Sequence, residues 1–532
     1  MTAMPHRWAL PSRASDASSV YAIARRLGIT LAILLCFLPR IGFLARPFES
    51  DAGLYAYMGK VVATGGAYGQ LYRDFYETKT PGVALFTGVI WRLLGDYWPA
   101  WVALQILMVY AAARALRTCA TRTWGEGAGI TAFWFTLVFL NFGPVAYRGF
   151  QLETIVTFFA IMGTRAGWCC ITENSHTQAS PLPALHFPTH APFILGFCAG
   201  IAAMIKPTGG AVFGAFAITF LAQRKWRAFI PATIGFLLPL LTVFAWTASA
   251  GLLPEMPSLW REISLYGSQT PLPITEFLIK SATIAVIAGF TLYAARRLGR
   301  GAPITQPATP TPQLFNQISA LTLFVLTWLA LECFGVYVQK RMYAYHFLPI
   351  AAPLALLCAR MVAGFTAKPL GLLAAFAPIV ALSLLWSRTD LKTLYTTGPA
   401  PLPESTYLLT NAAPGDRVVG DGIERLLMET HLRSGTRYAH LFYLANHDLA
   451  PAEYGARFLA DMESNRPEWA IFESPEIWRQ HRQLTIREMP LFAERPIRAQ
   501  AYLQATDQIQ TYIESHYTPQ AQLGNKTIWK RR

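Results

Sequence analysis

Acidic side chains occur at two points where the chain passes between apolar runs. Glu49 and Asp51 follow the first apolar run, and Glu153 opens the fourth. A carboxylate at a membrane edge can accept a proton from a hydroxyl group or bind a cation. An ordinary interfacial loop acid, or an acid that compensates a helix dipole, has the same sequence signature. Each acid by itself leaves both interpretations open.

Basic side chains that could hold an anion occur beside the same runs. Lys79 precedes a short apolar stretch, where an ammonium and the amide groups of a helix start would act together on an anion. A lysine that merely reaches for water at the membrane surface explains Lys79 equally well. Lys206 interrupts two apolar runs, and a lysine in lipid needs an anionic partner. Arg341 and His346 add further positive charge beside a later run.

The two kinds of residue together suit a group-transfer reaction at a membrane surface. The acids could activate an acceptor hydroxyl group, and the bases could stabilise a lipid phosphate as the leaving group. This chemistry requires that apolar segments bring residues from distant parts of the chain to one face of a membrane.

The composition predicts such a membrane protein. The chain has 532 residues, of which 53% are hydrophobic and 14% are charged, whereas a soluble domain typically carries about 25% charged residues. This excludes a disordered chain, a nucleic-acid-binding protein with a basic face and a purely soluble enzyme. We therefore expect an all-α polytopic membrane protein.

Apolar runs long enough to approach a membrane span number eleven. The expected spans are 27–45, 98–113, 127–146, 154–171, 192–205, 209–222, 228–250, 276–295, 317–336, 346–363 and 369–386. The shorter run 81–94 contains Arg92 and is better interpreted as a juxtamembrane or re-entrant helix.

The net charge of +15 belongs entirely to the apolar part. Residues 387–532 contain 17 basic and 17 acidic residues, which leaves 28 basic and 13 acidic residues in the first 386. The basic residues cluster in the connections expected on the cytoplasmic side, as the positive-inside rule requires. We expect a cytoplasmic N-terminus (1–26), an uncleaved signal anchor, and a C-terminal region on the outer face.

The domain organisation follows from these patterns. Residues 27–386 form the expected transmembrane domain, with a long first outer loop at 46–96, and 387–532 form a linker and a small α/β domain. Strand patterns at 416–420 and 469–472 and a helical pattern at 453–465 support the latter. The seven cysteines all precede residue 387, and their spacing does not indicate zinc ligands or a disulfide framework.

Four motifs resemble the GT-C superfamily of membrane glycosyltransferases. They are SDAGLYAYMGKVVATGGAYGQLYRDFYETKTPG, QLETIVTFFAIMG, MIKPTGG and RMYAYHFLPIAAPLALL, and they extend over roughly residues 27–386. The chain looks closest to the bacterial branch related to protein O-mannosyltransferases and the lipid A aminoarabinose transferase. The C-terminal region resembles that branch only loosely.

The resemblance implies an inverting glycosyltransferase that takes a sugar from a polyprenyl-phosphate carrier. The acceptor would be a hydroxyl group of an envelope glycolipid, polysaccharide or protein at the outer face of a bacterial inner membrane. Asp51 falls on the family's catalytic aspartate, as acid or base, and Glu153 on the acid of the second outer loop. The donor phosphate would be held by Lys79, Lys206, Arg341 and His346, and contacts to acceptor or sugar would come from Glu49, Tyr55, Arg148 and Tyr345.

One departure concerns the residue after Asp51. Many relatives have Asp-Glu where this chain has Asp51-Ala52, so a metal or acceptor contact made by the second acid is absent here. Relatives that use a monophosphate carrier generally do without an essential metal, so the resemblance implies no metal and no other cofactor. The expected partners are the carrier-linked sugar, the acceptor and membrane lipids, and not nucleic acid.

The main alternative is a transporter or flippase for a lipid-linked or anionic substrate. Transporters usually show inverted repeats and midplane sites, whereas here the charges gather at one expected face and no repeat is visible. A polymerase that uses a diphosphate-linked glycan should have a larger late outer loop and a larger outer domain. A scaffold protein gives no reason for Lys206 in an apolar run.

Overall fold

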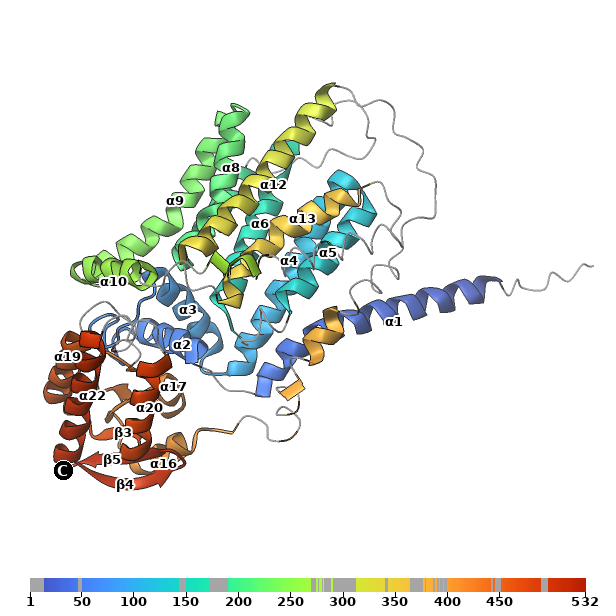
Figure 1. The fold of residues 1–532 in the computed structure, drawn as a ribbon. Helices are drawn as coiled ribbons and strands as arrows, with labels where there is room; N and C mark the ends of the chain where they lie inside the picture. The colour runs from blue at the N-terminus through green and yellow to red at the C-terminus, as the bar shows by residue number, and fades with distance from the viewer. Residues whose placement is uncertain are drawn as a thin grey trace, which may run out of the picture.

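The computed structural model is mostly helical, with one small mixed sheet near the C-terminus (Figure 1). It describes residues 14–45, 50–142, 150–172, 190–268, 312–339, 343–363, 400–441, 451–488 and 496–532, residue 444, and isolated positions within 274–289 and 377–396.

A bundle of apolar helices makes up the larger part of the described structure. Its helices are α1 (Ala14–Ile41), α4 (Trp98–Trp124), α5 (Glu126–Leu140), α6 (Leu152–Thr172), α7 (Ala191–Ile205), α8 (Ala211–Ala222), α9 (Trp226–Ser249), α12 (Pro312–Gln339) and α13 (Ala351–Met361). Within the described residues, six helical stretches are long and apolar enough to cross a membrane: Arg26–Leu44, Trp98–Trp124, Leu152–Thr172, Trp226–Ser249, Ala320–Gln339 and Ala344–Met361.

Nine of the eleven expected spans overlap helices of this bundle. The expected spans 276–295 and 369–386 lie largely outside the described residues. Helices α5, α7 and α8 are shorter than the six candidate spans. The total number of spans therefore stays a prediction, whereas the polytopic helical character is confirmed.

The connection between the expected spans 98–113 and 127–146 is largely helical. Helix α4 continues to Trp124 and carries the arginines of this segment in its final turns. Nothing in the segment interrupts a helix before Gly125, which has a φ of 92° and ends α4. Basic side chains near a helix C-terminus compensate the helix dipole, so positive charge does not by itself mark a loop.

Small residues allow the bundle helices to approach closely. A Cβ atom on Gly196 of α7 would lie 1.8 Å from the carbonyl oxygen of Ala232 on α9, and one on Gly235 of α9 would lie 2.2 Å from that of Phe193. Close packing of this kind replaces the hydrophobic effect as the source of helix association in lipid. The outward face of α9 is apolar and exposed, as a lipid-facing surface should be.

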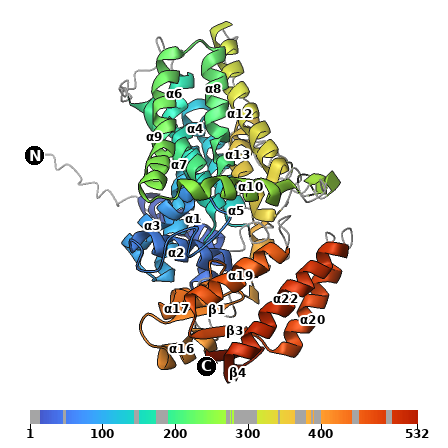
Figure 2. The ribbon, with the colours of Figure 1, turned by 90° about the vertical axis from the view of Figure 1, so that its left-hand side faces the viewer.

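The first outer loop folds into two helices at one end of the bundle. These are α2 (Ser50–Ala63) and α3 (Pro81–Leu94), the second with the bounds expected from the sequence. A third short helix, α10 (Met256–Ser268), crosses the same end of the bundle (Figure 2).

The C-terminal domain contains a five-stranded sheet of order β2-β1-β3-β5-β4. Strands β1 (Arg417–Gly420), β2 (Arg433–Ser434) and β3 (Trp469–Glu473) run parallel, and β4 (Tyr517–Leu523) and β5 (Lys526–Arg531) form an antiparallel hairpin beside β3. The helices are α16 (Pro403–Asn411), α17 (Glu424–Thr430), α19 (Pro451–Asn465), α20 (Pro475–Glu488) and α22 (Pro496–His516). The expected strands at 416–420 and 469–472 and helix at 453–465 are confirmed.

The C-terminal domain shares a hydrophobic core with the first outer loop. One cluster of buried side chains includes Tyr57 and Phe75 of the outer loop and Leu427 and Trp469 of the C-terminal domain. Both figures place the domain next to α2. The domain is therefore packed onto this end of the bundle rather than only connected to it through a linker.

Replacing Gly82 by alanine tests the packing between α3 and the bundle. A Cβ atom there would lie 2.1 Å from the carbonyl oxygen of Met204 on α7, and overpacking of this kind typically costs about 1–3 kcal/mol. We expect Gly82→Ala to lower the thermal unfolding midpoint of the detergent-purified protein. Gly210→Ala is the matched control, because its Cβ atom would meet nothing closer than 3.7 Å. Equal midpoints for the two variants would contradict this packing.

Candidate functional site

The break between α7 and α8 places a lysine at the end of the bundle. Helix α7 ends at Ile205, and Lys206 adopts an extended conformation with φ −144° and ψ 123°. Pro207 follows it and begins a short 3-10 helix, Pro207–Gly210. Proline cannot donate a backbone hydrogen bond, which explains the break at this position.

Lys206 forms an ion pair with the acid that opens α6. Its Nζ lies 2.7 Å from Oε1 of Glu153, and both side chains are mostly buried. Glu332 of α12 also lies within electrostatic reach of Lys206, and its Oε1 accepts a hydrogen bond from Trp328 Nε1 at 2.9 Å. Glu332 was not among the residues predicted from the sequence, although an acid within an expected span is a signal that could have identified it.

The first outer loop brings Lys79 to the same place. Oγ1 of Thr80 lies 2.9 Å and 3.1 Å from the carbonyl oxygens of Met204 and Ile205, directly before Lys206. The hydroxyl group of Tyr72 holds the backbone carbonyl of Lys79 at 2.6 Å. The two lysines expected to bind an anion thus come from segments that are joined by hydrogen bonds.

Several acidic groups act electrostatically on the buried phenol of Tyr55 in α2. Burial raises the pKa of its phenol well above the ordinary value, and the charges of Asp51 and Glu153, the phenol of Tyr345, and the charge of Glu77 raise this pKa further. These groups therefore all lie within electrostatic reach of one buried phenol. Asp51, in the first turn of α2, shares this reach with Glu153.

Tyr345 and His346 belong to the 3-10 helix that precedes α13. This helix is Ala344–Ile350, and the rings of Tyr345 and His346 lie 4.8 Å apart, centroid to centroid. Tyr343 contacts both rings. The structure therefore brings Tyr345 to the cluster around Tyr55, with His346 beside it.

Three expected site residues lie outside the described residues, namely Glu49, Arg148 and Arg341. The cluster that the described residues form at one end of the bundle contains Asp51, Tyr55, Lys79, Glu153, Lys206, Tyr345 and His346.

A buried arginine beneath this cluster was missed in the sequence analysis. Arg40 of α1 is fully buried and donates hydrogen bonds to Asn141 Oδ1 at 2.7 Å, Gln105 Oε1 at 2.8 Å, the Leu140 carbonyl at 2.7 Å and Thr154 Oγ1 at 3.1 Å. Its position within the first apolar run was the available signal.

The Arg40 network fixes the start of α6. Gln105 accepts a hydrogen bond from Arg40 and donates one to the carbonyl of Gln151 at 2.7 Å, directly before α6 begins. Thr154, one residue after Glu153, accepts from Arg40 as well. Arg40 therefore fixes the chain before and after Glu153 through uncharged hydrogen-bond partners.

A second cluster of ionisable groups lies where the outer loop meets the C-terminal domain. His440 Nε2 is 3.5 Å from Glu77 Oε2 and 3.8 Å from Glu424 Oε1. Burial alone lowers the pKa of His440, but the nearby carboxylates of Glu77, Glu424 and Asp421 outweigh it and raise this pKa to about 9. Burial raises the pKa of Glu424 to about 7, against the charge of His440.

Within the described part of the chain, no group of three or more His, Cys, Asp or Glu side chains is arranged to hold a metal ion. The ionisable clusters described above are therefore treated as ion pairs and hydrogen-bond networks.

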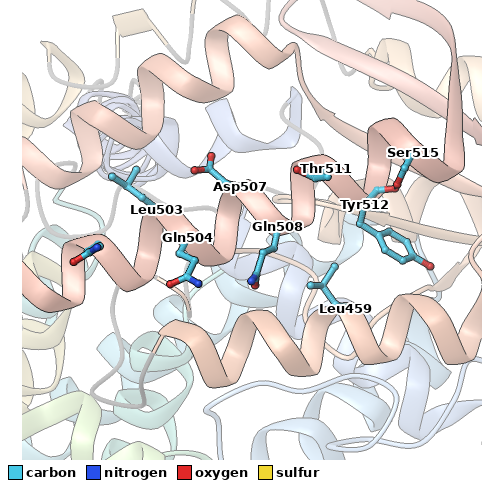
Figure 3. A pocket seen from close by; sticks show the side chains of 9 residues that line it. Leu459, Leu503, Gln504, Asp507, Gln508, Thr511, Tyr512 and Ser515 are labelled. Carbon is cyan, nitrogen blue, oxygen red and sulfur yellow. The ribbon is translucent and has the colours of Figure 1, made fainter.

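The C-terminal domain carries a solvent-open groove of about 770 Å³ that is separate from these clusters. Figure 3 shows its lining, which comes mainly from one face of α22, including Gln504, Gln508 and Tyr512, with Leu459 from α19. None of the expected site residues lines it.

Comparison with known proteins gives matches among solved structures alone. No family model and no curated protein matches the chain. The structure is similar to an oligosaccharyltransferase from Archaeoglobus fulgidus, tethered to an acceptor peptide, with a TM-score of 0.46, 10% identity, and coverage of 84% of this chain and 68% of that one.

It is also similar to ArnT from Cupriavidus metallidurans. The apo form matches with a TM-score of 0.43, 14% identity, and coverage of 96% of this chain and 98% of that one. A form bound to undecaprenyl phosphate matches with a TM-score of 0.41 and 13% identity over 95% of this chain and 97% of that one. Similarity at this level leaves the chemistry to be argued from the residues.

Replacing Arg40 tests the network beneath the site. Arg40→Leu would leave several buried acceptors without a donor, each at a cost of about 1–3 kcal/mol, so we expect a clear fall in the thermal unfolding midpoint. The midpoint of Arg40→Lys should lie between those of Arg40→Leu and the wild type, because an ammonium group cannot reproduce the planar set of donors of a guanidinium group. Arg92→Leu is the control, since Arg92 is exposed and contacts only the Ala63 carbonyl among the described residues. A midpoint for Arg40→Leu no lower than that control would contradict this role.

Proposed function

We propose that this chain is a glycosyltransferase that moves a sugar from a polyprenyl-phosphate carrier to a hydroxyl group of a cell-envelope acceptor. The observation that carries the proposal is the convergence of two carboxylates and two lysines at one end of an apolar bundle. They come from α2, the segment before α3, the start of α6 and the break after α7. The acceptor is a glycolipid, polysaccharide or protein.

In this proposal the lysines hold the phosphate of the donor. Lys206 and Lys79 lie at the end of the bundle, where a lipid phosphate at the membrane surface can reach them. As the bond between the anomeric carbon and the phosphate oxygen breaks, negative charge grows on the carrier phosphate. Fixed ammonium groups in a partly buried site stabilise that charge without reorganisation. His346 and Arg341 are assigned a supporting contact to phosphate.

The carboxylates act on the acceptor. Asp51 orients the attacking hydroxyl group and takes its proton, while the hydroxyl oxygen forms a bond to the anomeric carbon from the face opposite the phosphate. The sugar configuration is therefore inverted, and the carrier leaves as polyprenyl phosphate. Glu153, whose side chain is fixed by Lys206, positions the acceptor or the sugar. Tyr55 and Tyr345 supply neutral contacts to sugar hydroxyl groups.

The site would face the outer side of a bacterial inner membrane. The N-terminus is then cytoplasmic, and the C-terminal domain lies in the periplasm, in accord with the positive-inside distribution of charge. The chemistry proposed for these residues requires no metal ion.

Replacing Asp51 tests the transfer step. We expect Asp51→Asn to lower turnover by at least about 10²-fold, within the usual range for loss of a general base, and to leave the unfolding midpoint unchanged. Mass spectrometry of membrane lipids should detect the carrier-linked sugar accumulating in cells with the variant. Glu126→Gln is the control, because Glu126 is exposed at the opposite end of the bundle. Turnover like that of the wild type in Asp51→Asn would remove the catalytic role, and unchanged carrier lipids would favour a transporter.

Replacing Lys206 tests donor binding. We expect Lys206→Met to raise the apparent KM for the donor about tenfold to hundredfold, since a hydrogen bond between charged groups contributes roughly 1.5–3 kcal/mol. Lys225→Met is the control, because Lys225 contacts the Cys170 carbonyl in a different part of the bundle. A donor KM equal to that of the control would argue against the phosphate role.

A further inference from the structure

The segment around Tyr76, close to Lys79 in the sequence, contacts a segment of the C-terminal domain that lies more than 350 residues further along the chain. The backbone amide of Tyr76 donates to the carbonyl of Arg437 at 2.6 Å, and the rings of Tyr76 and Tyr438 lie 5.8 Å apart. The hydroxyl group of Tyr76 also donates to Glu262 of α10. The segment that leads into Lys79 is therefore held by the C-terminal domain as well as by the bundle.

Glu77 lies between a cation of the outer loop and a cation of the C-terminal domain. Its Oε1 is 3.8 Å from Nζ of Lys79, and its Oε2 is 3.5 Å from Nε2 of His440. Oε1 also accepts hydrogen bonds from the amide and hydroxyl groups of Thr78, at 2.9 Å and 3.2 Å. The Glu77 carboxylate therefore interacts with both Lys79 and His440.

The C-terminal domain fixes His440 from both sides. The amide of Leu441 donates to Asp421 Oδ1 at 2.7 Å, and the carbonyl of Ala439 accepts from the amide of Ile423 at 3.1 Å. The charged groups that act on the imidazole are Glu77 from the outer loop and Glu424 and Asp421 from its own domain. His440 is therefore a rigid cation presented to Glu77.

We propose that His440 is a positioning residue for Lys79, because its imidazolium holds the Glu77 carboxylate and leaves the Lys79 ammonium available to an anionic phosphate. This inference rests on the proposed function, in which Lys79 binds the donor phosphate. If His440 loses its charge, the Glu77 carboxylate interacts more strongly with Lys79, and a phosphate must compete with that carboxylate. The docked C-terminal domain then affects the donor site through Glu77 and Lys79.

The coupling between docking of the C-terminal domain and phosphate binding must act in both directions. If docking of the C-terminal domain strengthens phosphate binding, bound phosphate must strengthen docking by the same factor. A purely structural ion pair between His440 and Glu77 has no such consequence, which allows an experiment to separate the two roles.

The experiment compares phosphate binding in the wild type, His440→Gln, Glu77→Gln, the double variant and Lys79→Ala. The full-length protein is purified in detergent, and binding of undecaprenyl phosphate is followed by intrinsic tryptophan fluorescence. We expect His440→Gln to weaken binding about tenfold, within the usual range of coupling between sites. The double variant should return to near the wild-type affinity, because removing the carboxylate releases Lys79.

A pH series provides a second readout. With a pKa of about 9, His440 is charged at neutral pH and loses its charge as the pH rises through that value. The wild-type affinity should therefore fall through about pH 9 more steeply than that of the double variant, which retains Lys79 but lacks both partners. Thermal midpoints of all variants report their folding separately.

Each failure has a different meaning. If Lys79→Ala weakens binding but His440→Gln does not, the inference is wrong and the proposed function stands. If His440→Gln and the double variant are equally weak, His440 has a structural role, and the inference is again wrong. If Lys79→Ala binds undecaprenyl phosphate like the wild type, the donor-phosphate role of Lys79 fails, and the inference fails with it.

Discussion

The ion pair between Glu153 and Lys206 is the interaction on which the candidate site depends. A lysine at a break between two apolar helices is costly unless an anion meets it, and Glu153 does so at 2.7 Å from the start of α6. The pair thereby fixes the end of α7 against the beginning of α6. Thr80 then joins the outer loop to the same point, which places Lys79 beside it.

Two further networks support this arrangement from opposite directions. From within the bundle, Arg40 satisfies neutral acceptors on α4, α5 and α6 and so holds the segment that carries Glu153. From outside, the C-terminal domain shares a core with the outer loop and places His440 against Glu77. The candidate site therefore lies close to the contact between the bundle, the segment 50–94 and the C-terminal domain.

Much of the local structure could be predicted from the sequence. The short helix at 81–94, the helix break at Lys206 and the strands at 416–420 and 469–472 follow from apolar run length, proline position and periodicity, which act over a few residues. The connection between the expected spans 98–113 and 127–146 is helical as far as Trp124, which the positive charge of this segment did not indicate. The terminal hairpin of β4 and β5 was not predicted, because polar residues interrupt the apolar pattern of both strands.

The sequence by itself determined that the chain is a membrane protein, where its main helices lie and which residue types could act on a phosphate and a hydroxyl group. These properties depend on composition and on neighbours along the chain. The tertiary structure decided which charges meet: Lys206 with Glu153 and Glu332, Arg40 with neutral acceptors, and Glu77 with both Lys79 and His440. Most of these partners are separated by tens to hundreds of residues, and only the packing of helices and of the C-terminal domain brings them within the few ångströms over which charges and hydrogen bonds act strongly.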